Sequence, residues 1–124
     1  MAVFLVLSNP PEGVSAQEFN AWYDHHVDQI LTLDGFTAAE RFGLRFMRSS
    51  SGEEPPFGYL AQFETDGPFD VAWQALRKAV DVDHTLDFPE WFPQMTAAGW
   101  ERLPLSGRVV ARSGTNAPPP ADGR

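Results

Sequence analysis

The stretch FNAWYDHHVDQILTLDGFTAAERF, residues 19–42, contains two periodic patterns that meet at Asp34-Gly35. Before this pair, apolar side chains recur every three or four residues, which predicts an amphipathic helix. Ser15 opens that helix and can form a capping box with Glu18. The predicted helical stripe comprises Phe19, Trp22, Tyr23, His26, Ile30 and Leu31.

After Gly35 the pattern alternates, which predicts a strand over Phe36–Met47. Thr37, Arg41 and Arg45 are expected on its polar face. The apolar face, interrupted by Glu40, is expected to carry Phe36, Ala38, Phe42, Leu44 and Phe46.

The flanking sequence predicts two further strands and a second helix around this unit. Val3–Leu7 is uniformly apolar, which is typical of a strand covered on both faces. A third strand is expected over Phe57–Thr65, and Gly67-Pro68 starts a second helix with an apolar stripe. That stripe comprises Phe69, Ala72, Trp73, Leu76 and Val80.

The C-terminal part is expected to be less regular. Asp81–Met95 is aromatic and irregular, with one short helical turn at Asp87-x-x-Glu90, and Ala98–Leu103 is predicted to be the last strand. The resulting order β-α-β-β-α-β predicts an α+β, ferredoxin-like fold with an antiparallel sheet and two helices on one face. We expect one domain over residues 1–105 and a Pro/Gly-rich flexible tail over residues 106–124.

Composition excludes several classes of partner. The net charge of −8 argues against nucleic acid and against anionic membrane surfaces. The chain has no cysteine, which excludes disulfides, thiolate metal sites and a cysteine nucleophile and fits a reducing compartment. The apolar N-terminal run is too short for a membrane helix and lacks the flank of a signal peptide, so we expect a cytoplasmic protein. The second face of the sheet needs a cover, and a homodimer is the simplest one.

His26 is the leading candidate for chemistry. Its helical position places it in the apolar stripe, whereas His25 is rotated outward. A buried imidazole among aromatic rings is a candidate acid/base near neutral pH. The alternative is a structural histidine with a backbone or carboxylate partner.

Other candidates surround it in the prediction. Arg41 can stabilise an oxyanion, or it can form a salt bridge with Glu40, Glu64 or Glu101. Tyr23 and Tyr59 can donate hydrogen bonds to a carbonyl, or serve only as core aromatics. We also name a set of substrate-binding candidates, each of which has a core or surface alternative: Trp22, Tyr59, Trp73, His84, Phe88, Trp91 and Phe92. We expect no metal site, because His25 and His26 cannot both face one ion from a regular helix.

The same 24-residue stretch resembles the signature of the EthD-like group of dimeric α+β-barrel proteins. Val27-Asp28-Gln29 and Asp34 stand where many relatives carry proline. The resemblance implies a homodimer with a pocket between sheet and helices, extends in element order over residues 2–104, and is poorly specific for reaction. It is carried by Trp22, Tyr23, His26, Ile30, Leu31, Gly35, Phe36 and Arg41.

Three functions follow as hypotheses. The first is a cofactor-independent enzyme that performs cyclisation, isomerisation, dehydration or a lyase step on a small hydrophobic carbonyl or phenolic compound. His26 would move the proton, and Arg41, Tyr23 or Tyr59 would steady the oxyanion. The second is a non-catalytic binding module for a hydrophobic metabolite. The third is a haem-binding or cofactor-free monooxygenase-like relative.

Overall fold

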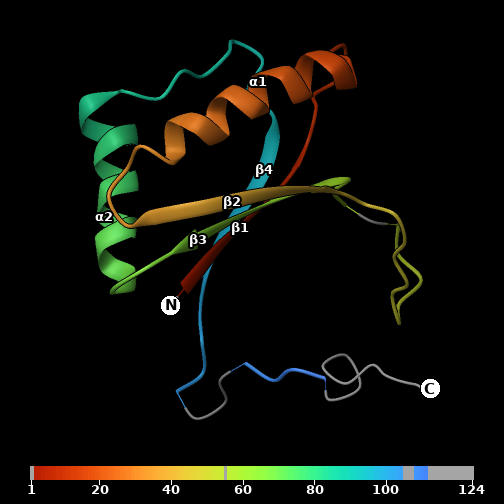
Figure 1. Cartoon of the computed structure of the whole chain (residues 1–124). Coiled ribbons are helices and arrows are strands. Elements are labelled where there is room, and N and C mark those ends of the chain that lie inside the picture. Colours follow the sequence, from red (N-terminus) through yellow and green to blue (C-terminus); the bar gives the residue numbers. More distant parts are fainter. Residues whose placement is uncertain (1, 55, 105–107, 112–124) are drawn as a thin grey trace, which may run out of the picture.

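The strands of the computed structural model form one antiparallel sheet in the order β2-β3-β1-β4, and both helices lie on one face of it (Figure 1). The structure describes residues 2–54, 56–104 and 108–111. This arrangement confirms the predicted α+β, ferredoxin-like fold. The elements are β1 (Ala2–Asn9), α1 (Ala16–Ile30), β2 (Phe36–Gly43), β3 (Tyr59–Thr65), α2 (Phe69–Lys78), a π-helical turn (Ala79–Asp83) and β4 (Gln94–Glu101).

The first helix begins and ends as the sequence predicts. The Ser15 hydroxyl accepts a hydrogen bond from the backbone N–H of Glu18 at 3.1 Å, which caps the helix. Gly35 follows α1 with a φ of +90°, and a Cβ there would lie 3.1 Å from the Ala72 Cβ. Glycine is therefore required both by the backbone and by the close approach of this turn to α2.

The second strand differs from the prediction in length and in phase. It ends at Gly43 instead of Met47, and its pairing with β3 shifts by one residue between Phe36 and Ala38. A bulge of this kind exchanges the two faces of all the residues beyond it. Arg41 consequently pairs with the buried Ala61 on the helix side, while Phe42 faces away from the helices.

The predicted boundaries near the C-terminus also need correction. The last strand begins at Gln94, four residues before the predicted Ala98, and ends at Glu101 rather than Leu103. The predicted helical turn at Asp87–Glu90 is wrong, because that segment has no regular secondary structure. The π-helical turn ends at His84, whose φ of 51° lies in the left-handed region.

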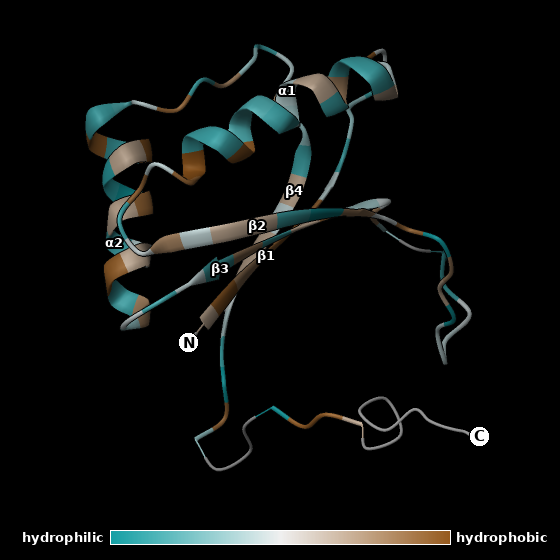
Figure 2. Cartoon of the chain, in the orientation of Figure 1, coloured by the Kyte–Doolittle hydropathy of each residue, from teal (hydrophilic) through white to brown (hydrophobic). Residues whose placement is uncertain are grey.

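The hydrophobic core lies between the helices and the sheet. In Figure 2 apolar residues colour much of β1, while α1 alternates between apolar and hydrophilic residues. The opposite face of the sheet carries exposed apolar side chains, including Leu7, Phe42 and Trp100. Among the described residues, no helix is both long and apolar enough to cross a membrane.

Most of the predicted tail, residues 106–124, lies outside the described residues, so its flexibility and its boundary stay predictions.

Candidate functional site: an apolar cavity beside His26

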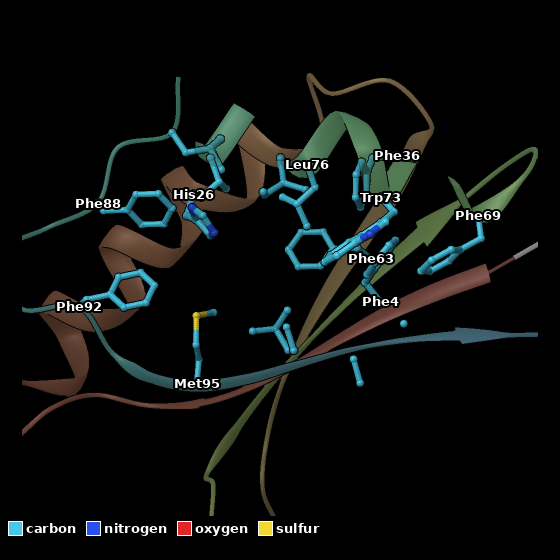
Figure 3. Close-up of a pocket in the computed structure, with 17 residues that line it drawn as sticks. Phe4, His26, Phe36, Phe63, Phe69, Trp73, Leu76, Phe88, Phe92 and Met95 are labelled. Carbon is cyan, nitrogen blue, oxygen red and sulfur yellow. The ribbon is translucent and has the colours of Figure 1, made fainter. Parts of the chain in front are cut away.

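A cavity of about 460 Å³ lies between α1, α2, the sheet and the segment 84–93 (Figure 3). This volume suits a small organic molecule. Among the described residues that line it, His26 carries the one titratable side chain. The lining comprises Phe4, Val6, His26, Ile30, Phe36, Phe63, Phe69, Trp73, Leu76, Val80, Leu86, Phe88, Phe92, Met95, Ala97, Ala98 and Gly99.

Small side chains on β4 create the room for this cavity. Ala97 and Gly99 face the helices, in register with Val6 and Phe4 of β1. A Cβ on Gly99 would lie only 2.5 Å from Phe69 Cε1, so this position does not accept a larger residue without movement of Phe69. The small side chains of β4 therefore leave room for the cavity above this strand. Aromatic rings from α2 and β1 also line the cavity.

His26 points inward, as its helical position predicts, and is 6% exposed. Its ring stacks on Trp22 with centroids 4.8 Å apart and lies 5.8 Å from the ring of Phe88. Within the described residues the ring makes no hydrogen bond, and its buried Nδ1 has no partner. The predicted alternative, a histidine satisfied by a backbone or carboxylate group, is therefore wrong for the described residues.

Burial lowers the pKa of His26 from 6.5 to about 4, and the neighbouring His25 adds to this shift. The imidazole is consequently neutral near pH 7. A neutral imidazole has one donor and one acceptor nitrogen, so it can receive a proton from a ligand or donate a hydrogen bond to it.

Tyr23 lies next to His26 and Arg41 lies over the Tyr23 ring, but neither residue lines the cavity. Burial raises the pKa of Tyr23 to about 12, an effect opposed first by the charge of Arg41 and then by the nearby Ser8 hydroxyl. The Tyr23 and Ser8 hydroxyls nevertheless do not reach hydrogen-bond geometry with each other. Because neither residue lines the cavity, the Tyr23 hydroxyl and the Arg41 guanidinium are not placed to contact a molecule bound there.

The guanidinium of Arg41 has a packing role in this structure. Its Cζ lies 4.4 Å from the centroid of the Tyr23 ring, and its Nη2 donates to Asn20 Oδ1 at 2.9 Å. Its acidic partner is Asp24, with Nη1 and Oδ1 3.5 Å apart. The predicted salt bridge to Glu40, Glu64 or Glu101 is therefore wrong, because the bulge in β2 turns this side chain toward α1.

The other predicted binding residues divide into two groups. Trp73, Phe88 and Phe92 line the cavity. Four do not: Trp22 stacks behind His26, Trp91 packs edge-on against Trp22, Tyr59 packs on Phe19, and His84 is exposed at its turn.

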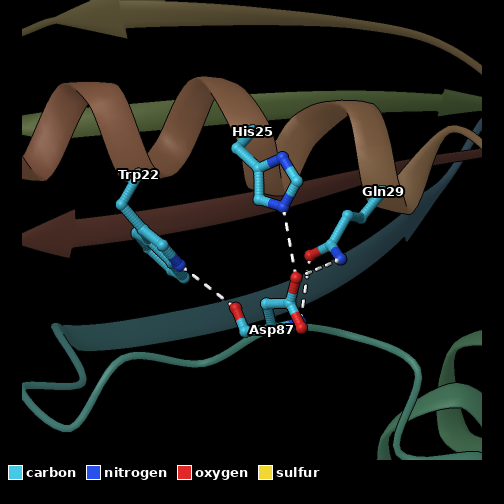
Figure 4. A network of polar contacts seen from close by, with 4 residues as sticks. All are labelled: Trp22, His25, Gln29 and Asp87. Atoms are coloured by element: carbon cyan, nitrogen blue, oxygen red, sulfur yellow. Dashed lines mark hydrogen bonds and ion pairs between the residues drawn. The ribbon is translucent and has the colours of Figure 1, made fainter.

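Two features of the site do not follow from the sequence pattern: the cavity floor on β4 and the role of Asp87. Asp87 joins the segment 84–93 to three side chains of α1 (Figure 4). The Asp87-x-x-Glu90 spacing predicts a helix cap at this residue, not a contact across the fold. The described residues contain no group of three or more histidines and carboxylates that could hold a metal ion.

Comparison with known proteins adds evidence on the fold. No family model matches the chain, and no curated protein matches it. The crystal structure of At3g17210 from Arabidopsis thaliana is similar with a TM-score of 0.62 and 8% sequence identity, over 86% of this chain and 99% of that one. At this identity the similarity concerns the fold alone.

Proposed function

We propose that this protein is an enzyme that performs acid/base chemistry on a small, largely apolar carbonyl or phenolic compound, with His26 as the proton-transferring group. One observation carries the proposal: among the described residues, His26 is the one titratable side chain that faces the 460 Å³ cavity, and it has no hydrogen-bond partner there. An imidazole whose ring nitrogens have no hydrogen-bond partner in an apolar cavity is available to a ligand.

The chemistry follows from the neutral imidazole. A ring nitrogen takes the proton from a carbon next to the substrate carbonyl, and the electron pair of the C–H bond forms the enolate. In an isomerisation the imidazolium returns the proton to the γ-carbon of a conjugated enolate. In a cyclisation the enolate carbon attacks a second carbonyl, and the proton goes to the alkoxide that forms. In a dehydration or lyase step the enolate expels a β-leaving group, which takes the proton. The proposal invokes no cofactor.

The surroundings of His26 determine how this step is stabilised. Its lowered pKa makes the imidazolium unfavourable in the empty cavity. An enolate formed next to it supplies the opposite charge, and the attraction between the two is strong in an apolar site. In this scheme the ion pair, and not Tyr23 or Arg41, carries the developing oxyanion charge.

Deuterium exchange into 2-tetralone, an aromatic ketone with acidic α-protons, tests the proton transfer without knowledge of the natural substrate. We expect the protein to accelerate exchange in D₂O, followed by NMR. His26→Gln should reduce the acceleration by about 10²–10⁴-fold. His84→Asn serves as the matched control, since His84 is exposed and Asn tolerates its left-handed backbone. Acceleration that survives His26→Gln within a few-fold contradicts the proposal.

A non-catalytic binding module is the second candidate. It is favoured because, in the part of the chain that the structure describes, His26 has no carboxylate partner and the lining offers no charged or hydroxyl side chain to an oxyanion. It predicts that 2-tetralone binds in the cavity without accelerated exchange. It also predicts that the affinity changes little in His26→Gln. The two candidates thus differ in the same experiment.

The setting that we propose for this activity is a cytoplasmic homodimer. The exposed apolar residues on the open face of the sheet support a second copy as its cover. The absence of cysteine fits a reducing compartment. The resemblance to the EthD-like group supports the same assembly, and we propose membership of that group on the residues quoted above.

A further inference from the structure

The wall of the cavity next to His26 comes from an irregular segment, residues 84–93, that crosses from the end of α2 to the start of β4. Leu86 and Phe88 of this segment line the cavity, and so does Phe92. Leu86 is buried, whereas Asp87 between the two lining residues is exposed. The segment thus places apolar side chains in the cavity and Asp87 outside it.

Asp87 makes four hydrogen bonds to α1 (Figure 4). Its backbone carbonyl accepts from Trp22 Nε1 at 3.1 Å, and its backbone N–H donates to Gln29 Oε1 at 3.0 Å. Its carboxylate accepts from Gln29 Nε2 at 3.2 Å and from His25 Nε2 at 3.3 Å. These partners lie on both sides of His26 along the helix. Asp87 therefore attaches the segment to α1 at positions before and after His26.

These bonds are accessible to water. The side chain of Asp87 is 77% exposed and that of His25 is 59% exposed. Contacts of this kind are individually weak because water competes for each partner. The π-helical turn ends just before the segment and the left-handed His84 is its first residue, so no regular helix extends into it. Separation of the wall from α1 breaks these bonds and the ring contacts of Phe88, Trp91 and Phe92 with α1, but it leaves the sheet and both helices intact.

We propose that Asp87 is a positioning residue that holds the wall of residues 84–93 closed over His26, and that ligands enter and leave when its bonds to α1 break. This inference rests on the proposed function, because it assigns the cavity to a ligand that reacts at His26. In the closed state Phe88 lies beside the His26 ring, which is 6% exposed. In the open state the His26 ring itself becomes accessible to solvent beside α1.

Stopped-flow binding of 1-naphthol, a fluorescent phenol, tests the gating. Asp87→Ala and Gln29→Ala should each raise the association and dissociation rate constants by about fivefold or more, with a smaller change in Kd. Glu90→Ala is the matched control, since it removes an equal charge from the same segment. Rate constants for both variants that match those of Glu90→Ala overturn the proposal.

A second readout does not depend on any ligand. The Trp22 indole N–H donates to the backbone carbonyl of residue 87, which Asp87→Ala does not remove. Solvent exchange of this proton, measured by NMR, should accelerate in Asp87→Ala only if the wall opens more often. Unchanged exchange overturns the gating. Absence of 1-naphthol binding in the unmodified protein, with accelerated exchange in the variant, counts against the proposed function alone.

Discussion

His26 and Arg41 are only 15 positions apart in the sequence, yet the sequence predicts one of them well and the other poorly. The place of His26 follows from helical periodicity, which is reliable over a long amphipathic segment, and the structure confirms that it points inward. The place of Arg41 depends on strand phase, and one bulge reverses that phase. The Asp34-Gly35 pair beside Phe36 marks the end of the helix, but it does not indicate a bulge inside the strand that follows.

The packing of Arg41 gives a prediction at this scale. Arg41→Ala removes the hydrogen bond to Asn20 and the contact with the Tyr23 ring. We expect a loss of about 1–3 kcal/mol in the free energy of unfolding, measured with urea. The affinity for 1-naphthol should stay within about threefold, because Arg41 does not line the cavity.

Arg45→Ala is the control, since Arg45 is exposed just beyond the end of β2. A folded Arg41→Ala protein with unchanged stability and abolished binding would instead place the guanidinium in contact with the ligand.

At the scale of elements, the strand that forms the cavity floor was the hardest to place. The inner positions of β4 are Met95, Ala97 and Gly99, and the outer ones include Ala98 and Trp100. Alanine and glycine on the inner face produce almost no apolar alternation, so the first half of this strand was not recognised. The same small residues make room for the cavity. The alanine and glycine that make this strand hard to predict are therefore also the residues that shape the site.

The segment 84–93 illustrates a second limit of the sequence. The spacing of Asp87 and Glu90 is typical of a helix cap, but Asp87 instead bonds side chains about 60 positions earlier. Local patterns do not reveal contacts across such separations. The order of helices and strands was nevertheless predictable, because each remaining element carries a strong local period or turn signal.

At the scale of the whole molecule, the open face of the sheet determines the expected assembly. Leu7, Phe42 and Trp100 are exposed there, opposite the face that the helices cover. Apolar surface of this kind favours burial against a second copy. The sequence predicts that this face needs a cover, because the Val3–Leu7 strand is apolar on both sides and only one side packs against the helices.

The dimer is testable with one charged substitution. We expect the unmodified protein to sediment as a dimer at about 50 µM, and Trp100→Lys to shift it to monomer by placing an ammonium group in the interface. Val71→Lys is the control, because Val71 is an exposed apolar residue on α2, away from the open sheet face. A monomeric unmodified protein, or a dimer that Trp100→Lys leaves intact, contradicts this assembly.

Burial of His26 makes the stability of the protein depend on pH. Because burial lowers its pKa to about 4, the unfolded chain takes up a proton below the ordinary value of 6.5 while the folded chain does not. The contribution of this group to the free energy of unfolding is therefore complete above pH 6.5 and is lost as the pH falls toward 4. His26→Gln should remove this part of the acid destabilisation.

An NMR titration of the His26 ring C–H resonances, with and without 1-naphthol, tests the central claim that this imidazole faces an apolar ligand cavity. We predict a midpoint near 4 in the free protein and a clear shift of these resonances when 1-naphthol is added. A midpoint at the ordinary value of 6.5 or above, with resonances that do not respond to the phenol, would contradict the account.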